Sequence, residues 1–154
     1  MKNESAVLES IAVQRRKRRL KGTHSRDRLS GLLNSRAARK YISAYLKKMG
    51  PDDISAMFLI DVDDFRRING DFGYLAGNYA LQRAGELLSA LFRASDIVCR
   101  LGGDEYLVFM SGNITKDEVW ERADKICQEV QFPIGSQQEA SGRVSVGVCR
   151  VFGK

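Results

Sequence analysis

The sequence predicts an α+β domain in which helices pack against a mostly antiparallel sheet. Segments with helical apolar spacing alternate with short apolar runs, and two of those runs flank a Gly-Gly pair. The 154 residues are enough for one sizeable core but not for two. Apolar residues make up 44% and charged residues 29%, which is typical of a folded globular protein. We therefore expect one α+β domain with flanking helices.

Apolar periodicity and turn residues divide the chain into successive elements. Apolar residues three and four positions apart predict helices, and short or alternating apolar runs predict strands. Thr115–Glu118 forms a capping-box pattern that opens the last helix. The expected elements, in order, are helix Ser5–Leu20, helix Ser35–Met49, strand Met57–Ile60, a helix containing Leu81–Leu91, hairpin strands Ile97–Arg100 and Glu105–Met110, helix Thr115–Val130, and strand Val144–Val148.

Glycines are concentrated in two of the connections. Gly70, Gly73 and Gly77 predict a loop before the third helix. Gly102-Gly103 predicts a tight hairpin turn with positive φ, which also lets a bulky ligand approach the backbone closely.

The net charge of +6 is unevenly distributed along the chain. The basic run Arg15–Arg19 and Lys21 together carry as many positive charges as the net charge of the whole chain. Such a run is typical of contacts with nucleic acid or an anionic membrane, and a solvated helix face is the alternative that we favour. Because the remainder is close to neutral, a general nucleic-acid-binding protein is not indicated.

The sequence contains few signs of targeting or redox chemistry. The longest apolar runs, Ala56–Ile60 and Tyr106–Met110, are too short to cross a bilayer, and the N-terminus does not resemble a secretory signal. The three cysteines form no CxxC pair, so we expect each of them to be a small buried apolar residue. They are Cys99, Cys127 and Cys149. These features predict a cytoplasmic location.

Acidic residues gather at two predicted strand ends. Asp61 closes the first strand, with Asp63 and Asp64 just after it, and Asp104 and Glu105 lie at the hairpin tip. Carboxylates at adjacent strand ends repel each other unless cations lie among them, and Mg²⁺ prefers oxygen ligands that it shares with phosphates. The pattern predicts a two-metal site, and an ordinary solvated hairpin turn is the alternative. The phosphate-binding pattern GxxxxGK[ST] is absent from the sequence, so this is not a P-loop protein.

Three segments of the chain have the character of motifs, Asp27–Arg36, Asp61–Asn69 and Arg100–Tyr106. They resemble motifs of the GGDEF family of diguanylate cyclases. Arg100–Tyr106 resembles the RxGGDEF signature, with Tyr in place of the final Phe. Asp61–Asn69, followed by Gly73 and Gly77, resembles the family block DxDxFKxIND…GHxxGD, and Asp27–Arg36 resembles its opening DxLTGLxNRR. The order and spacing of the motifs match those of the family.

The resemblance implies a palm-like, nucleotidyl-cyclase-like domain over residues 23–154, preceded by a basic linker or signalling helix over residues 1–22. Its activity would be the Mg²⁺- or Mn²⁺-dependent condensation of two GTP into cyclic di-GMP and two pyrophosphates. Each domain would hold one GTP, so catalysis would need a homodimer. An upstream sensor domain, which could be membrane-tethered in the parent protein, would supply the signal.

The resemblance also implies roles for residues at the matching positions. Side chains and one carbonyl would ligate the metal ions, backbone groups would hold phosphates, and two side chains would read the guanine edge. For metal binding and catalysis the residues are Asp61, Asp104, Glu105 and the Val62 carbonyl. The backbone around Asp64 and Phe65 would hold the phosphates, and Asn69 and Asn78 would read the base. Gly102 and Gly103 would let the purine or the triphosphate approach the backbone closely.

A further motif, Arg93–Asp96, resembles the RxxD inhibitory site at which the product cyclic di-GMP binds. The guanidinium of Arg93 suits phosphate and guanine edges, and the Asp96 carboxylate can accept guanine N–H donors. A simple ion pair between residues three apart is the alternative.

Several positions depart from the family pattern. Asn78 stands where the family usually has Asp, so we expect weaker or altered guanine recognition. Tyr74 replaces the usual His and Gly70 the usual Asp, and the chain ends at Phe152–Lys154, before the basic final helix of the family. We therefore keep two hypotheses: a diguanylate cyclase domain, and a degenerate regulatory module that binds GTP or cyclic di-GMP without catalysis.

Overall fold

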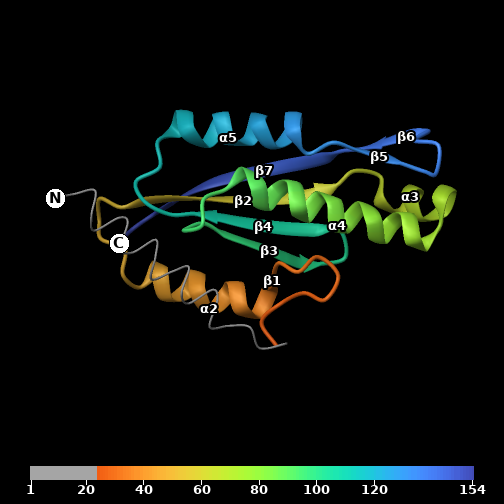
Figure 1. The fold of residues 1–154 in the computed structure, drawn as a ribbon. Helices are drawn as coiled ribbons and strands as arrows, with labels where there is room; N and C mark the ends of the chain where they lie inside the picture. Colours follow the sequence, from red (N-terminus) through yellow and green to blue (C-terminus); the bar gives the residue numbers. More distant parts are fainter. Residues whose placement is uncertain (1–23) are drawn as a thin grey trace.

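A five-stranded sheet separates one helix on one face from two helices on the other (Figure 1). The computed structural model describes residues 24–154, so the expected helix Ser5–Leu20 and the basic run Arg15–Arg19 lie outside the described residues. No helix within residues 24–154 is long and apolar enough to span a membrane.

The strands lie in the order β1-β3-β4-β2-β7, and every neighbouring pair is antiparallel except β1 with β3. This confirms the predicted α+β class with a mostly antiparallel sheet. The strands of this sheet are β1 Leu33–Asn34, β2 Ile54–Val62, β3 Ile97–Gly102, β4 Glu105–Met110 and β7 Val144–Phe152, and a separate two-stranded sheet joins β5 Phe132–Ile134 to β6 Ala140–Gly142.

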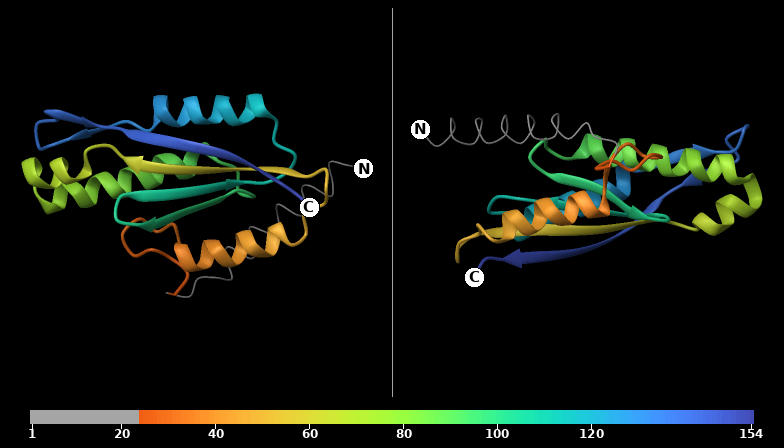
Figure 2. Two further views of the ribbon diagram at one scale, coloured as in Figure 1. Left: turned by 180° about the vertical axis from the view of Figure 1, so that it is seen from behind. Right: turned by 90° about the horizontal axis from the view of Figure 1, so that it is seen from below.

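The helices are α2 Ser35–Leu46, α3 Phe65–Phe72, α4 Tyr74–Leu91 and α5 Lys116–Glu129. Views from other directions place α3 and the β5–β6 hairpin together at one end of the molecule (Figure 2). The C-terminus lies at the opposite end, where Phe152 pairs with Ile54 at the start of β2.

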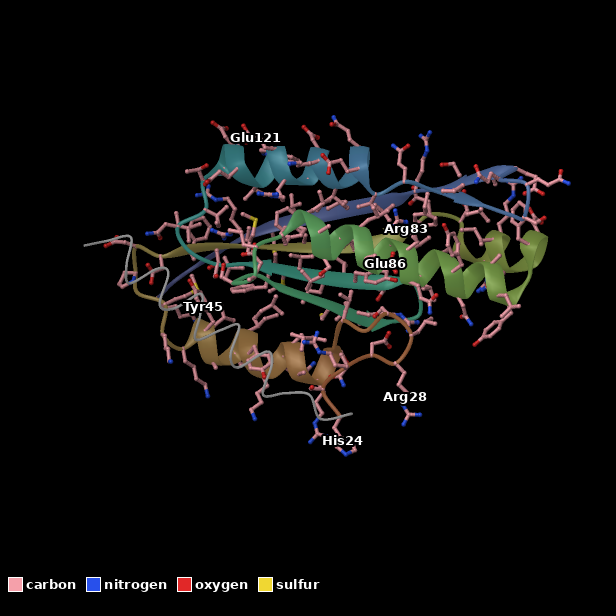
Figure 3. All side chains as sticks on the ribbon, in the orientation of Figure 1. His24, Arg28, Tyr45, Arg83, Glu86 and Glu121 are labelled. Atoms are coloured by element: carbon pink, nitrogen blue, oxygen red, sulfur yellow. The ribbon has the colours of Figure 1, made fainter. Side chains whose placement is uncertain are left out.

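Strand alternation divides the core into two layers, because successive side chains point to opposite faces. On one face, Phe58, Ile60 and Tyr106 are fully buried beneath α4 and α5. On the other face, α2 packs against the sheet, and the ring of Tyr45 meets that of Phe109 edge to face at 5.4 Å between centroids (Figure 3). Packing on both faces fixes the register that brings the acidic strand ends together.

The predicted loop around the three glycines is wrong. Only Gly73, with φ of 89°, breaks the chain there, while Gly70 lies in α3 and Gly77 in α4. The buried side chain of Ile68 anchors α3, and Gly77 is itself buried in the helix packing. Tertiary packing therefore outweighs the weak helix propensity of glycine.

Four smaller expectations also need correction. Helix α2 ends at Leu46 rather than at Met49, and β2 continues beyond Ile60 through Asp61 to Val62. The hairpin turn consists of Gly103 and Asp104, because Gly102 belongs to β3 and pairs with Glu105 beside a bulge. Among the cysteines only Cys99 is buried. Cys127 is exposed because it lies off the buried stripe of α5 that contains Ile126, and Cys149 is exposed because it alternates with the inward residue Val148 in β7.

Candidate active site

The register of the sheet brings the two acidic segments to one strand end. Asp61 near the end of β2 lies directly opposite Glu105 at the start of β4. One residue further on, the Val62 N–H donates to the carbonyl oxygen of Asp104 at 3.1 Å. Residues more than forty positions apart in the sequence therefore meet at the end of the sheet from which α3 begins.

The hairpin that carries Asp104 depends on glycine at two positions. Gly102 has a φ of 143° and Gly103 a φ of 54°, conformations that residues with a Cβ adopt only with strain. A Cβ at either position would meet no atom within 4 Å, so backbone conformation rather than crowding favours glycine. The same open space leaves the hairpin backbone accessible to a ligand.

Arg100 holds the hairpin in place. Its Nε and Nη2 donate to the carbonyl of Gly103 at 3.2 and 2.7 Å, and its Nη1 donates to Asp27 Oδ1 at 3.0 Å. The other carboxylate oxygen of Asp27 accepts from the backbone N–H and the hydroxyl of Ser30, both at 2.7 Å. Burial acts to raise the pKa of Asp27, but the Ser30 hydrogen bonds and the Arg100 charge outweigh it, so the pKa is lowered.

The Asp27–Arg100–Gly103 connection joins the opening motif to the hairpin motif. Sequence reasoning did not assign roles to Asp27 or Arg100, although both belong to the quoted motifs. Nothing in their spacing indicates that residues 73 positions apart would pair.

Tyr106 ties the hairpin to helix α4. Its ring is fully buried, and its hydroxyl donates to the backbone carbonyl of Leu81 in α4 at 2.5 Å. Burial raises the pKa of this hydroxyl well above its usual range, so the group remains a donor. The Tyr that replaces the family Phe therefore adds a hydrogen bond between β4 and α4.

The segment between β2 and α3 is held by Arg143 and Ser145, at the start of β7. The Asp63 N–H donates to the carbonyl of Arg143 at 2.8 Å, and Asp63 Oδ1 accepts from the Ser145 hydroxyl at 2.5 Å. Asp64 then adopts a left-handed conformation with φ of 52°, and α3 begins at Phe65. The first-turn amides of a helix have no intrahelical acceptor, which suits them to phosphate oxygens.

Of the two asparagines predicted to read the base, Asn69 lies in α3 and contacts α4, and Asn78 lies in α4. A Cβ built on Gly77 would lie only 1.8 Å from Asn69 Oδ1, so the Asn69 amide rests against α4 one residue from Asn78. Asn69 Oδ1 is buried and has no hydrogen-bond partner. A buried acceptor without a partner is costly, and this one marks a place where a ligand donor would be stabilising.

Arg93 and Asp96 form an ion pair with each other. The Asp96 carboxylate, 1% exposed, accepts from the Arg93 backbone N–H at 2.8 Å, Nε at 3.2 Å and Nη2 at 2.9 Å. Arg93 Nη2 also donates to the carbonyl of Ser111 at 2.8 Å, and the Asp96 hydrogen bonds raise the pKa of the guanidinium. The pair thus fastens the α4–β3 connection, and its role as an inhibitory site stays a prediction.

The acidic residues suit a hard cation but do not form a three-carboxylate cluster. Within residues 24–154, no group of three or more His, Cys, Asp or Glu side chains is placed to hold a metal ion. In the same part of the chain, none of the ion pairs involves Asp61, Asp104 or Glu105. Two unpaired carboxylates and a backbone carbonyl are a fitting donor set for Mg²⁺, which keeps several waters and shares substrate phosphates.

A palm-like sheet with acids at the end of β2 and a Gly-Gly-Asp-Glu hairpin defines the class of domain. The family model described as diguanylate cyclase, GGDEF domain, matches residues 24–154. The chain belongs to the GGDEF domain family of diguanylate cyclases.

Individual relatives agree with this assignment. The chain is 32% identical over 134 residues to the response regulator PleD of Caulobacter vibrioides, a match covering 83% of this chain and 29% of PleD. It is 29% identical to the isolated GGDEF domain of TpbB (YfiN) from Pseudomonas aeruginosa, with a TM-score of 0.75 over 81% of this chain and 74% of that one. A microbial GGDEF domain solved in its interaction with cyclic di-GMP is 26% identical, with a TM-score of 0.65 over 85% of this chain and 79% of that one. The chain therefore spans less than a third of the length of PleD.

Proposed function

We propose that this domain condenses two GTP into cyclic di-GMP with release of two pyrophosphates. The observation that carries the proposal is the juxtaposition of Asp61 with the hairpin, fixed by the β2–β4 register and by the bond from the Val62 N–H to the Asp104 carbonyl. Membership of the diguanylate cyclase family supports the same reaction.

A divalent cation, Mg²⁺ or Mn²⁺, fits the carboxylates of Asp61 and Asp104 together with the Val62 carbonyl. When bound, such a cation neutralises triphosphate charge and favours ionisation of the attacking 3′-hydroxyl. Glu105, opposite Asp61 in the register, completes the acidic site.

The remaining site residues bind and orient the nucleotide. Backbone amides around Asp64 and Phe65, at the start of α3, hold phosphate oxygens. Gly102 and Gly103 let the substrate approach the hairpin, and the carboxamides at the α3–α4 junction orient the base. Positioning and charge neutralisation carry the catalysis, because the protein forms no covalent bond to the substrate.

Catalysis requires two domains face to face, since the 3′-hydroxyl on one domain attacks the α-phosphate held by the other. The product is also a candidate inhibitor: a related GGDEF domain was solved in its interaction with cyclic di-GMP, and Arg93 and Asp96 match the inhibitory motif. In the parent protein, an upstream sensor domain would control how the two domains meet.

A second candidate function is a regulatory module that binds GTP or cyclic di-GMP without turnover. Asn78 in place of Asp favours it, because an amide accepts fewer guanine N–H donors than a carboxylate.

Incubation with GTP and Mg²⁺, followed by mass spectrometry, separates the two candidates. The cyclase proposal predicts cyclic di-GMP and pyrophosphate from the wild type and no product from Asp104→Ala. Product formation by that variant, or none by the wild type under conditions where it binds GTP, would contradict the cyclase assignment. The second outcome would favour the regulatory module.

A further inference from the structure

Two carboxamides, that of Asn69 in α3 and that of Asn78 in α4, distinguish the base end of this site. The Asn69 amide rests against Gly77, and Asn78 follows Gly77 directly in α4. Asn69 Oδ1 is buried without a partner, and no side-chain hydrogen bond described for residues 24–154 involves half-buried Asn78. Both amides therefore have hydrogen-bonding capacity that the protein itself does not use.

An amide at position 78 can pair with more kinds of base edge than a carboxylate can. A carboxylate only accepts, so it matches the N1–H and N2–H donors of guanine and opposes the N1 lone pair of adenine. An amide carries one acceptor and one donor group, and rotation of the amide exchanges them. It can accept from guanine N1–H while donating to O6, or accept from adenine N6–H while donating to N1.

The carboxylate also excludes adenine by charge, whereas a neutral amide does not. Selectivity between two ligands commonly depends on a group that is unfavourable for the wrong one. With Asn78 this unfavourable group is absent, and the neighbouring Asn69 is likewise a neutral amide.

We propose that Asn78 makes the nucleotide site accept adenine as well as guanine at its α3–α4 end. The inference rests on the proposed nucleotide site, but it concerns base selectivity and does not require turnover. It assigns this domain to purine nucleoside triphosphates as a substrate class, rather than to GTP alone.

The test is equilibrium binding of GTP, ITP and ATP, each with Mg²⁺, measured by calorimetry on the 154-residue chain and on Asn78→Asp. For the wild type we expect the three dissociation constants to agree within about tenfold, since an amide has a pairing for each base edge. For Asn78→Asp we expect the ratio of the ATP to the GTP dissociation constant to rise at least about tenfold. ITP should weaken relative to GTP in the same variant, because it has no N2 donor.

Gln82→Glu is the matched control, because it adds the same charge at an exposed position one turn along α4. This variant should keep the wild-type ratios. A ratio of the ATP to the GTP dissociation constant above about ten for the wild type, or an equal ratio in wild type and Asn78→Asp, would overturn the inference while leaving a nucleotide site in place.

The result for base selectivity is separable from the result for catalysis. Binding of both purines without cyclic product would support the inference and contradict the cyclase assignment. Failure of all three nucleotides to bind would overturn the nucleotide site and the inference together. If turnover occurs, mixtures of GTP and ATP should give cyclic dinucleotides that contain adenine, and their share should fall in Asn78→Asp.

Discussion

Gly77 is the residue at which helix stability and site geometry conflict. Alanine in the interior of a helix is favoured over glycine by about 1 kcal/mol. At Gly77, however, a Cβ would lie 1.8 Å from Asn69 Oδ1. We therefore predict that Gly77→Ala displaces the Asn69 amide and weakens GTP binding about tenfold, equivalent to about 1.4 kcal/mol, as measured by calorimetry.

Gly70 provides the matched control for this substitution. It lies in α3, and a Cβ there would meet no atom within 4 Å. Gly70→Ala should raise the free energy of unfolding by about 0.5–1 kcal/mol and leave GTP affinity unchanged. Equal loss of affinity in both variants, or in neither, would contradict the role assigned to Gly77.

Asp27 gives a prediction for pH. Its folded pKa lies below its ordinary value of 3.8, so its contribution to stability is complete above that value and is lost as pH falls through the folded pKa. Asp27→Asn should lower the free energy of unfolding by about 1–2 kcal/mol at pH 7, because the Asn side chain has no charge for Arg100. In denaturant titrations between pH 7 and pH 2, the difference between the two proteins should narrow only below about pH 4. A difference that does not change with pH would contradict this account.

At the scale of elements, Tyr106 connects β4 to α4. Its hydroxyl donates to the Leu81 carbonyl inside the core. Tyr106→Phe should therefore reduce the free energy of unfolding by about 1 kcal/mol, measured by urea denaturation. Because burial raises the folded pKa of Tyr106 above its ordinary value of 10, this difference should be complete below pH 10 and diminish above it.

The half-buried Tyr41 in α2 offers the control, since no side-chain hydrogen bond described for residues 24–154 involves its hydroxyl. Tyr41→Phe should leave stability nearly unchanged. A loss as large as that of Tyr106→Phe would indicate a general effect of removing hydroxyls.

The elements that the sequence predicted are those with strong local signals. Helix α5 begins with the predicted capping box, in which Thr115 and Glu118 exchange hydrogen bonds. The β3–β4 hairpin forms at the predicted glycine pair, with Gly102 at the end of β3 and Gly103 in the turn. Helix α3 and the two residues of β1 were missed for opposite reasons. Glycines concealed the short helix, while β1 exists only because Leu33 and Asn34 pair with distant β3.

The site likewise contains residues that the sequence indicated and contacts that only the packing of distant segments creates. The motifs indicated Asp61 and Asp104, and the β2–β4 register confirms that their segments meet. The contacts of Arg100 with Asp27 and Gly103 were not predictable, because they depend on how distant segments pack. The partnerless Asn69 oxygen is likewise visible only once α3 rests on α4.

At the scale of the whole molecule, the proposed reaction needs two domains for each product molecule. If the chain is a monomer at low concentration, the initial rate of cyclic di-GMP formation should rise with the square of protein concentration. Initial rates and sedimentation velocity, measured over the same concentration range, check this expectation. A rate that is linear in concentration while the chain sediments as a monomer would contradict face-to-face catalysis.

The central claim is that the end of β2 and the β3–β4 hairpin form one cation-dependent nucleotide site. The most direct test is calorimetry of GTP binding with and without Mg²⁺ for the wild type, Asp61→Asn and Asp104→Asn. Asp71→Asn, an exposed carboxylate of α3 paired with Arg67, serves as the control. We predict that Mg²⁺ tightens GTP binding at least about tenfold in the wild type and in Asp71→Asn, and has little effect in the other two variants. The same Mg²⁺ dependence in all four proteins would contradict the claim.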